Sequence, residues 1–380
     1  MTVAHTSPNE MAQASHATGA VLTIDVNAIA ENWQNIAARV APAECAAVVK
    51  ANAYGLGIDH VAPALWRAGA RTFFVAHLQE GITLRALLPE AVIYVLNGLL
   101  PGSGFAFSAH ELRPVLGSHP EIGEWSAQCR ATGLDLPAAL HVDTGMHRLG
   151  LSLEEAAHIA RERASLRFTP SLVMSHLACA DTPGHPLTPL QQQRFAQVAQ
   201  QFSGIRASLA NSAGTQLDAS YHFDLVRPGI LLYGGRAIDD TPPLRPVARL
   251  EAPVIQVRTA SEGESVGYGA SERLKRDSRL AVVHIGYADG LFRAAGSSDA
   301  RKGAEVVLEG ARCPLVGRIS MDLATIDITD LPEGEIARGT GAVFLGAGIG
   351  VDDLAEKAGT ISYEVLTSLG ARYQRRYLGA

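Results

Sequence analysis

The sequence predicts an α/β plus β protein, with an N-terminal (β/α)8 TIM-like barrel followed by a C-terminal β-rich domain. Three observations support this fold class. Apolar and amphipathic segments alternate between residues 44 and 233, the alternation stops at a proline-rich stretch near residue 240, and short strands prevail beyond it. A length of 380 residues also fits about two domains.

The barrel prediction rests on the rhythm of the first part of the chain. Nearly continuous apolar strands are typical of a parallel sheet that is buried on both faces. About seven or eight strand–helix units in roughly 200 residues favour a closed barrel over an open sheet. The predicted strands are 44–50, 72–76, 92–97, 136–143, 168–177, 207–211 and 224–234, and the predicted helical stretches are 58–69, 77–88, 108–116, 152–164 and 188–202.

The second part of the chain has a different texture. Residues 241–253 are rich in proline and interrupt the strand–helix rhythm. Short strands separated by Gly- and Pro-marked turns follow, and only residues 351–370 have a helical pattern. The predicted domains are therefore a barrel over 21–240 and a β domain over 241–380.

The composition supports a large folded core. Hydrophobic residues make up 47% of the chain and charged residues 18%, which argues against extensive disorder. The net charge is −6 and no basic stripe is present, so we expect neither nucleic acid nor a membrane surface as a partner. No run of about 18 apolar residues occurs, and no membrane span is predicted.

Two further features bear on the compartment. Residues 1–20 lack a basic start and an apolar run, so we expect a disordered polar leader and not a secretory signal. Neither a CxxC pair nor zinc-like spacing occurs among the four cysteines, Cys45, Cys129, Cys179 and Cys313. This pattern fits a reducing compartment, although four cysteines also allow two bridges. We predict no metal site.

Lys50 is the first candidate for chemistry. It ends the apolar strand AAVVK and is followed by Tyr54 and two glycines in the segment AAVVKANAYGLG. Burying an ammonium group is costly, and desolvation lowers the pKa of such a lysine so that it forms Schiff bases. A rim lysine that extends to solvent would have the same local sequence.

Polar side chains follow two other predicted strands. Asp143 and Arg148 lie in HVDTGMHRLG, where the arginine can bind a carboxylate or simply pair with the aspartate. His176 ends the strand in SLVMSHL, where it can act as a base, a stacking face or an ordinary core histidine. Catalytic residues of (β/α)8 barrels gather at these carboxyl ends of strands.

The last two predicted strands are followed by turns that suit an anion. Ser212 lies in NSAGT, and the backbone amides of Gly229 and Ile230 follow Arg227 in VRPGILLYG. Barrels of this type often hold a phosphate after their seventh and eighth strands. Ordinary turns that close the barrel are the alternative.

Two tyrosines of the second domain stand beside glycines. Tyr268 lies in SVGYGA and Tyr287 in HIGYADG, and Met321 follows in GRISMDL. Glycine lets the backbone approach a ligand closely, so these segments are candidates for a binding surface. An aromatic side chain that fills a β-turn is the alternative at each position.

Together these segments resemble the alanine racemases that depend on pyridoxal 5'-phosphate (PLP), a fold-type III family. The resemblance runs in the same order from residue 22 to residue 377. VVKANAYGLG is similar to the family's cofactor-attachment signature, and further blocks match VDTGMHRLG, NSAGT, VGYGA, IGYADG, GRISMD and ISYEVL.

The resemblance implies a function, a cofactor and a set of site residues. It implies a cytoplasmic isomerase that makes D-alanine for peptidoglycan, acting as a homodimer whose active sites combine the barrel of one subunit with the β domain of the other. In that scheme Lys50 carries PLP and is one base, and Tyr268 of the partner subunit is the other. The implied cofactor-binding residues are Tyr54, His176, Ser212, Arg227, Gly229, Ile230 and Tyr363, and the implied substrate-binding residues are Arg148, Tyr287 and Met321.

Two bases follow from the chemistry of racemisation. One proton must leave one face of Cα and another must arrive on the opposite face, which a single side chain cannot easily do. Within the resemblance, Arg227 meets the pyridine nitrogen of the cofactor and His176 lies beside its ring. A tyrosine that acts as a base is helped by nearby positive charge.

The chain departs from the usual family pattern at one position that affects the substrate end. Much of the family has a lysine, carried as an anionic carbamate, where this chain has His141. A histidine cannot replace that anion, so Arg148 is predicted to lack it or to pair with a bound chloride or a rearranged carboxylate. His147, Leu56 and Ser320 are smaller departures.

Three alternatives to an alanine racemase remain. A racemase of broader range that includes serine is the nearest, because His141 alters the substrate end. A PLP barrel decarboxylase is disfavoured by Tyr268, since decarboxylation needs no second base. A PLP-binding homeostasis protein is disfavoured by the β domain, because those proteins are single barrels.

Overall fold

The structure is a computed structural model that describes residues 19–379. The chain forms two compact units, one of residues 28–245 and one that joins the residues up to Asn27 with those from Pro246 onward. Residues 1–18 of the predicted leader lie outside the described residues. Over 19–379, no helix has the length and apolar character needed to cross a bilayer.

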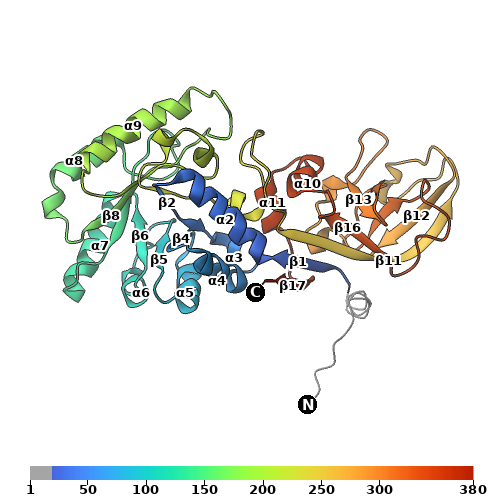
Figure 1. Cartoon of the computed structure of the whole chain (residues 1–380), viewed down its shortest axis with the longest axis horizontal. Coiled ribbons are helices and arrows are strands. Elements are labelled where there is room, and N and C mark those ends of the chain that lie inside the picture. The colour runs from blue at the N-terminus through green and yellow to red at the C-terminus, as the bar shows by residue number, and fades with distance from the viewer. Residues whose placement is uncertain (1–18, 380) are drawn as a thin grey trace, which may run out of the picture. The chain divides into compact units, whose positions relative to one another are not determined.

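Residues 28–245 form a ring of short parallel strands with helices around it (Figure 1). Seven strands pair in chain order, from β3 to β9, and β10 pairs parallel with β2. The Asp224 amide donates to Ala207 O at 3.0 Å and the Ala46 amide donates to Val226 O at 3.0 Å, which closes the ring. The predicted (β/α)8 barrel is therefore confirmed.

The barrel strands are buried on both faces, as the apolar runs predict. Every residue of β4 and β7 is buried. The strands are β2 (Glu44–Cys45), β3 (Ala47–Val48), β4 (Thr72–Val75), β5 (Val92–Val95), β6 (Arg113–Leu116), β7 (Ala138–His141), β8 (Pro170–Met174), β9 (Ala207–Ser208) and β10 (Leu225–Val226). The helices are α2 (Val26–Val40), α3 (Lys50–Tyr54), α4 (Ile58–Ala68), α5 (Leu78–Leu87), α6 (Gly104–Ala109), α7 (His119–Thr132), α8 (Leu153–Arg161) and α9 (Leu187–Gln201).

One predicted helical stretch is wrong. Residues 108–116 contain the end of α6 and then β6, a buried strand that pairs with β5 and β7. Pro114 explains the difference, because a proline inside a helix removes a hydrogen bond and clashes with the preceding turn. The helix after β6 is α7, whose polar and apolar residues follow no clear helical period.

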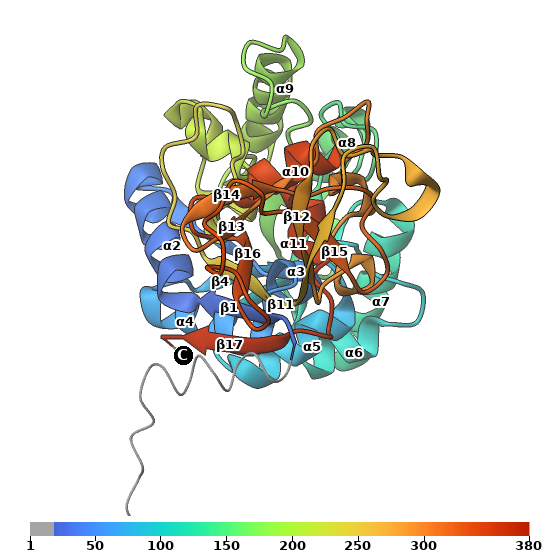
Figure 2. The same cartoon turned by 90° about the vertical axis from the view of Figure 1, so that its right-hand side faces the viewer.

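The second unit is built on a mostly antiparallel sheet, in which β1 and β17 pair parallel (Figure 2). Its strand order is β14-β13-β16-β11-β1-β17, and β12 joins β11 to β15. The strands are β1 (Val21–Asp25), β11 (Ala248–Ala260), β12 (Ser278–Val283), β13 (Glu305–Leu308), β14 (Ala311–Pro314), β15 (Ala324–Asp327), β16 (Gly341–Leu345) and β17 (Gln374–Leu378). The C-terminal β-rich domain is therefore confirmed as a fold.

Two details of this unit concern the sequence predictions. β1, which the sequence places in the barrel range, pairs with β11 and with β17, because these strands supply partners for both of its edges. The predicted helical region near the end contains α10 (Val351–Ala358) and α11 (Ser362–Thr367).

All four cysteines are free thiols, so the alternative of two bridges is wrong.

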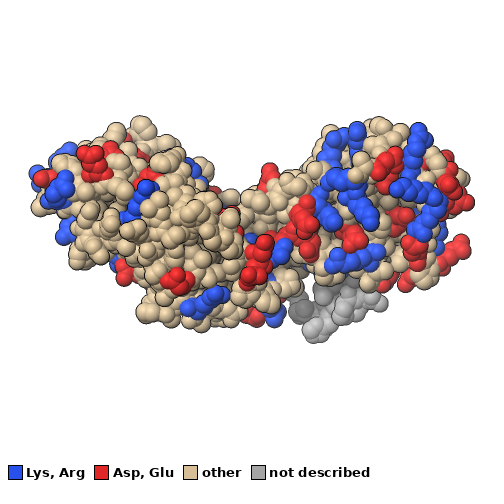
Figure 3. Space-filling view, turned by 90° about the horizontal axis from the view of Figure 1, so that it is seen from above, with Lys and Arg blue, Asp and Glu red and all other residues tan. Residues whose placement is uncertain are grey.

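Charge is distributed unevenly over the surface. In Figure 3, many Lys and Arg side chains lie on the β-rich unit and are mixed with Asp and Glu, whereas the barrel unit has few charges on the face shown. The mixture of signs is the opposite of a single basic stripe.

Candidate active site

Lys50 lies directly after the barrel strand β3 and is partly buried. Burial lowers the pKa of its ammonium group, nearby Arg148 lowers this pKa further, and Glu80 opposes both. The neutral amine is therefore more accessible near neutral pH than in an exposed lysine. Such an amine can attack a carbonyl carbon or accept a proton.

The Tyr54 hydroxyl and the Ser212 hydroxyl both lie beside Gly229. The Gly229 amide donates to Ser212 Oγ at 2.8 Å. A Cβ at residue 229 would stand 2.1 Å from Tyr54 Oη, so only glycine fits there. The Tyr54 ring stacks on Tyr233 at 4.5 Å, which fixes its position.

The amide of Ile230 adds a donor to this group. Ile230 is the first residue of the short helix η4 (Ile230–Tyr233), so its amide is not used inside that helix. Hydroxyl groups and backbone amides of this kind suit a phosphate group. Tyr54, Ser212, Gly229 and Ile230 are thus brought together from three separate loops of the barrel.

Arg227 is 4% exposed and is held by three acceptors. One guanidinium nitrogen donates to Ser208 Oγ, and the other donates to Ser175 O at 2.6 Å and to Leu209 O at 3.3 Å. Burial lowers the pKa of Arg227 to about 9, so the group still carries its charge at neutral pH. It is a fixed donor and not a proton acceptor.

His141 and His176 stand among the cationic groups of the barrel. Burial, and to a smaller extent the charges of Arg227 and Arg148, lower the pKa of His141 to about 4. The pKa of His176 is also well below its usual value, chiefly through burial and then through Arg227. Both imidazoles are therefore neutral at pH 7, and the positive potential comes from Lys50, Arg148 and Arg227.

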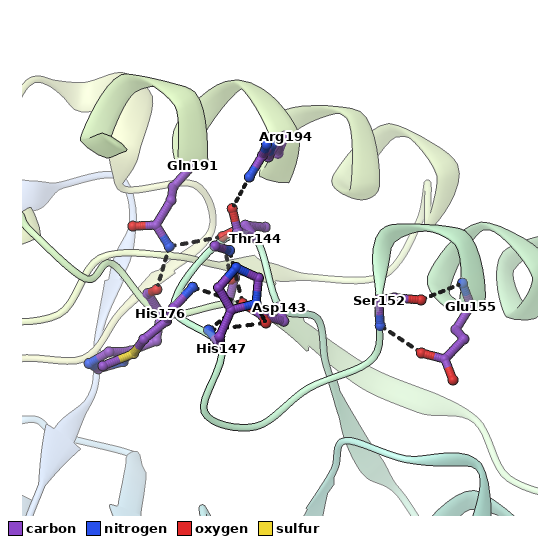
Figure 4. Close-up of polar contacts among 11 residues, drawn as sticks. Asp143, Thr144, His147, Ser152, Glu155, His176, Gln191 and Arg194 are labelled. Carbon is purple, nitrogen blue, oxygen red and sulfur yellow. Dashed lines mark hydrogen bonds and ion pairs between the residues drawn. The ribbon is translucent and has the colours of Figure 1, made fainter. Parts of the chain in front are cut away.

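The loop that carries Arg148 is shaped by Asp143 (Figure 4). Asp143 Oδ1 accepts from the amides of Gly145 and Met146, both at 2.9 Å, and Asp143 Oδ2 lies 3.1 Å from His147 Nδ1. These bonds occupy the carboxylate, which is therefore not a partner for the arginine. Within residues 19–379 we find no ion pair for Arg148.

Gln191 of α9 is a buried residue beside the candidate site that the sequence does not single out. It is fully buried, and its Nε2 donates to His176 O at 2.9 Å and to Thr144 Oγ1 at 3.2 Å (Figure 4). Its Oε1 accepts from the Ala178 amide at 2.8 Å. Gln191 thus joins the loops after β7 and β8, although nothing in the pattern of α9 distinguishes it.

The β-rich unit assembles the remaining predicted residues by itself. Tyr287 and Met321 lie together, because the Tyr287 amide donates to Ser320 O and the Ala288 amide to Met321 O, both at 3.0 Å. Tyr268 is 70% exposed. Tyr363 is part of α11 and is exposed at its surface.

Known proteins match the chain over nearly its whole length. Residues 24–237 match the family model of the alanine racemase N-terminal domain, and residues 247–377 match that of the alanine racemase C-terminal domain. The chain belongs to the alanine racemase family. The family resemblance predicted from the sequence is therefore confirmed.

Curated and solved members of the alanine racemase family cover the chain almost completely. The alanine racemase of Methylobacterium sp. (strain 4-46) is 53% identical over 361 residues, which is 95% of this chain and 98% of that protein. The biosynthetic alanine racemase of Agrobacterium fabrum is 48% identical over 367 residues, 94% of each chain. The crystal structure of the Bartonella henselae alanine racemase, with covalently bound pyridoxal phosphate, has a TM-score of 0.89 at 39% identity and covers 95% of this chain and 99% of that one.

Proposed function

We propose that this member of the alanine racemase family interconverts L-alanine and D-alanine with PLP as its cofactor. The observation that carries the proposal is the group of Lys50, Tyr54, Ser212 and Gly229 at one end of the barrel, next to the fixed charge of Arg227. Relatives that are named alanine racemases match almost all of this chain.

The residues present fit PLP. A phosphate group needs N–H and O–H donors in a positive field. Ser212, Tyr54 and the Ile230 amide supply donors, the Gly229 amide adds a further one beside Ser212 Oγ, and the missing side chain at Gly229 lets the Tyr54 hydroxyl approach the backbone. In the proposal these groups and Tyr363 hold the phosphate, Arg227 meets the pyridine nitrogen and His176 lies beside the ring.

PLP supplies one element of chemistry when bound: it withdraws electrons from Cα of the amino acid and makes the Cα–H bond acidic. The chain must then move protons. Lys50 Nζ accepts or returns the proton on one face of Cα, which its depressed pKa allows. Arg227 keeps its own proton and donates a hydrogen bond.

The second base of the proposal is Tyr268 of the partner subunit. Its ring is 70% exposed on its own unit, so the hydroxyl is available to a second protein surface. We infer a homodimer in which Tyr268 Oη serves the face of Cα opposite to Lys50. A single side chain would have to cross from one face to the other, which the two-base arrangement avoids.

The substrate end of the site combines three groups in the proposal. Arg148 and Tyr287 bind the carboxylate of the amino acid, together with the Met321 amide.

The proposed biological role is the supply of D-alanine for peptidoglycan from the cytoplasm. The biosynthetic name of the Agrobacterium fabrum relative supports this role.

The test is to incubate the purified holoenzyme with L-alanine and D-alanine in D2O. Circular dichroism follows loss of chirality, and proton NMR follows deuterium at Cα. We expect both enantiomers to converge on an equal mixture with deuterium at Cα. Release of CO2, or binding of PLP with no change at Cα, would contradict the proposal. L-serine in the same assay measures the breadth of the substrate range.

A further inference from the structure

We propose that Glu80 is a positioning residue for Lys50, because its carboxylate fastens the turn that follows Lys50 to the start of the neighbouring helix α5. This inference deepens the proposed function and rests on the role given there to Lys50. Glu80 is not among the residues proposed to bind the substrate or the cofactor.

The turn after Lys50 has an unusual backbone. The segment α3 is not a right-handed helix, since Ala51, Asn52, Ala53 and Tyr54 have φ values of 53°, 55°, 53° and 54°. Each residue with a side chain costs roughly 1–2 kcal/mol in this left-handed region. Four such residues in succession need support from their surroundings.

Some of this support comes from within the turn. The Ala53 amide donates to Val49 O at 2.9 Å, and the Gly55 amide to Ala51 O at 2.8 Å. The Asn52 side chain accepts from the Ile58 amide at 2.8 Å. These bonds hold the turn together internally but do not attach it to the rest of the barrel.

The Tyr54 ring, stacked on Tyr233, attaches the end of the turn to the barrel, and Glu80 attaches its beginning, next to Lys50. Glu80 Oε1 accepts from the Ala51 amide, the residue next to Lys50, at 2.6 Å. Glu80 Oε2 accepts from the Ala76 amide at 2.8 Å and from the His77 amide at 3.1 Å, where β4 ends and α5 begins. One carboxylate thus joins two adjacent strand ends through three backbone amides, and charged acceptors make the stronger hydrogen bonds.

The charge of Glu80 also affects the pKa of Lys50. Burial and Arg148 lower the pKa of Lys50, whereas Glu80 raises it. Loss of the Glu80 charge is therefore expected to lower the Lys50 pKa further. The same side chain affects both the place of the lysine and its affinity for a proton.

The barrel contains a matched control in Glu121. Glu121 Oε1 accepts from the Leu99 amide at 3.0 Å, and Glu121 Oε2 accepts from the Gly117 amide at 2.9 Å. It therefore joins the loop after β5 to the start of α7 in the way that Glu80 joins the loop after β3 to α5. No candidate site residue lies in those two loops.

The experiment compares E80Q, E80D and E121Q with the wild-type holoenzyme. The first readout is amide hydrogen exchange, followed by mass spectrometry, in a peptide that covers residues 51–57. The second is the dependence of kcat on pH, which reports the pKa values of the enzyme with substrate bound. Gln keeps the size of the side chain and removes its charge, whereas Asp keeps the charge and withdraws the oxygens from the Ala51 amide.

We expect E80Q to exchange residues 51–57 about tenfold faster than the wild type, and kcat to fall by about ten- to a hundredfold with a smaller change in KM. The acidic limb of its kcat profile should move to lower pH. E80D should also speed exchange but should leave that limb near its wild-type position. E121Q should match the wild type in both readouts.

The proposal is overturned if exchange of residues 51–57 is unchanged in E80Q and E80D, or if E121Q changes it equally. It is also overturned if E80Q speeds exchange and leaves kcat and the acidic limb unmoved. A wild-type protein that does not racemise alanine would refute the proposed function instead. The exchange comparison would still decide whether Glu80 holds the turn.

Discussion

The two proposed bases occupy opposite kinds of environment. Lys50 is partly buried in a turn that Glu80 ties to a neighbouring strand end. Tyr268 is 70% exposed and stands between Gly267 and Gly269, each with a φ of 76°. The barrel unit thus holds its proposed base in a partly buried turn, whereas the β-rich unit exposes its proposed base to solvent.

The two proposed bases are also positioned by different kinds of contact. Side-chain and backbone hydrogen bonds fix the Lys50 turn, while tight backbone packing fixes the Tyr268 segment. A Cβ at Gly267 would come within 3.2 Å of Arg318 N, so this glycine permits a close approach of two chain segments. An outward-facing tyrosine placed in this way has a catalytic role only when a second surface meets it.

Replacement of Lys50 by alanine should have the largest effect. K50A removes both the group that holds the cofactor and one base, and we expect racemisation to fall by about 10⁴-fold or more. The visible absorbance band of bound PLP should be lost as well. Activity near the wild-type level would show that another amine carries the reaction.

Replacement of Tyr268 by phenylalanine should be nearly as damaging to racemisation but should leave the fold intact. Because the ring is exposed on its own unit, the free energy of unfolding should change by less than about 0.5 kcal/mol. Racemisation should fall by about 10²- to 10⁴-fold. Exchange of Cα–H, measured by NMR in D2O, should persist for one enantiomer only, and equal loss from both would contradict the assignment.

Replacement of Gly229 by alanine should weaken the cofactor site. The new Cβ would stand 2.1 Å from Tyr54 Oη, so the tyrosine or the backbone must move. Loss of one charged hydrogen bond, roughly 1.5–3 kcal/mol, corresponds to about ten- to a hundredfold weaker binding of PLP. Fluorescence titration of the PLP-free protein measures this, with Gly123→Ala in α7, where the space is open, as the control.

A smaller effect concerns pH and His141. The pKa of this buried imidazole falls from 6.5 to about 4 on folding. Between these values the unfolded chain binds a proton that the folded chain does not, so stability decreases as the pH falls below 6.5. From pH 7 to 5 the loss is about 2 kcal/mol.

Urea unfolding of the wild type and of His141→Gln at pH 7 and pH 5 tests this sign. The wild type should lose about 2 kcal/mol more than the variant, because all other groups are shared. Equal losses would show that folding does not lower the pKa of His141.

Much of the barrel half of the site could be predicted from the sequence. Lys50, His176 and Arg227 each follow an apolar strand, and strands of a parallel barrel bring such residues to one end. The positions of Glu80 and Gln191 could not be predicted in this way. Their partners, Ala51 and Thr144, lie 29 and 47 residues away, and backbone partners leave no mark in the sequence.

The sequence around Glu80 does not reveal its contact with Ala51. A glutamate at the third position of a helix is a common cap, and Glu121 and Glu155 occupy the same position in α7 and α8. Only the fold shows that Glu80 reaches the residue after the lysine. The pairing of β1 with β11 and β17 was equally hidden, because its partners lie more than 200 residues away.

The most direct test of the central claim, that Lys50 and Tyr268 act in one site from two subunits, is a hybrid dimer. K50A and Y268F chains with different affinity tags are produced together, and dimers that hold one chain of each kind are isolated through both tags. One of the two sites in each hybrid then has both bases, so we expect about half of the wild-type activity per dimer. Activity no greater than that of the two parent variants would contradict the account.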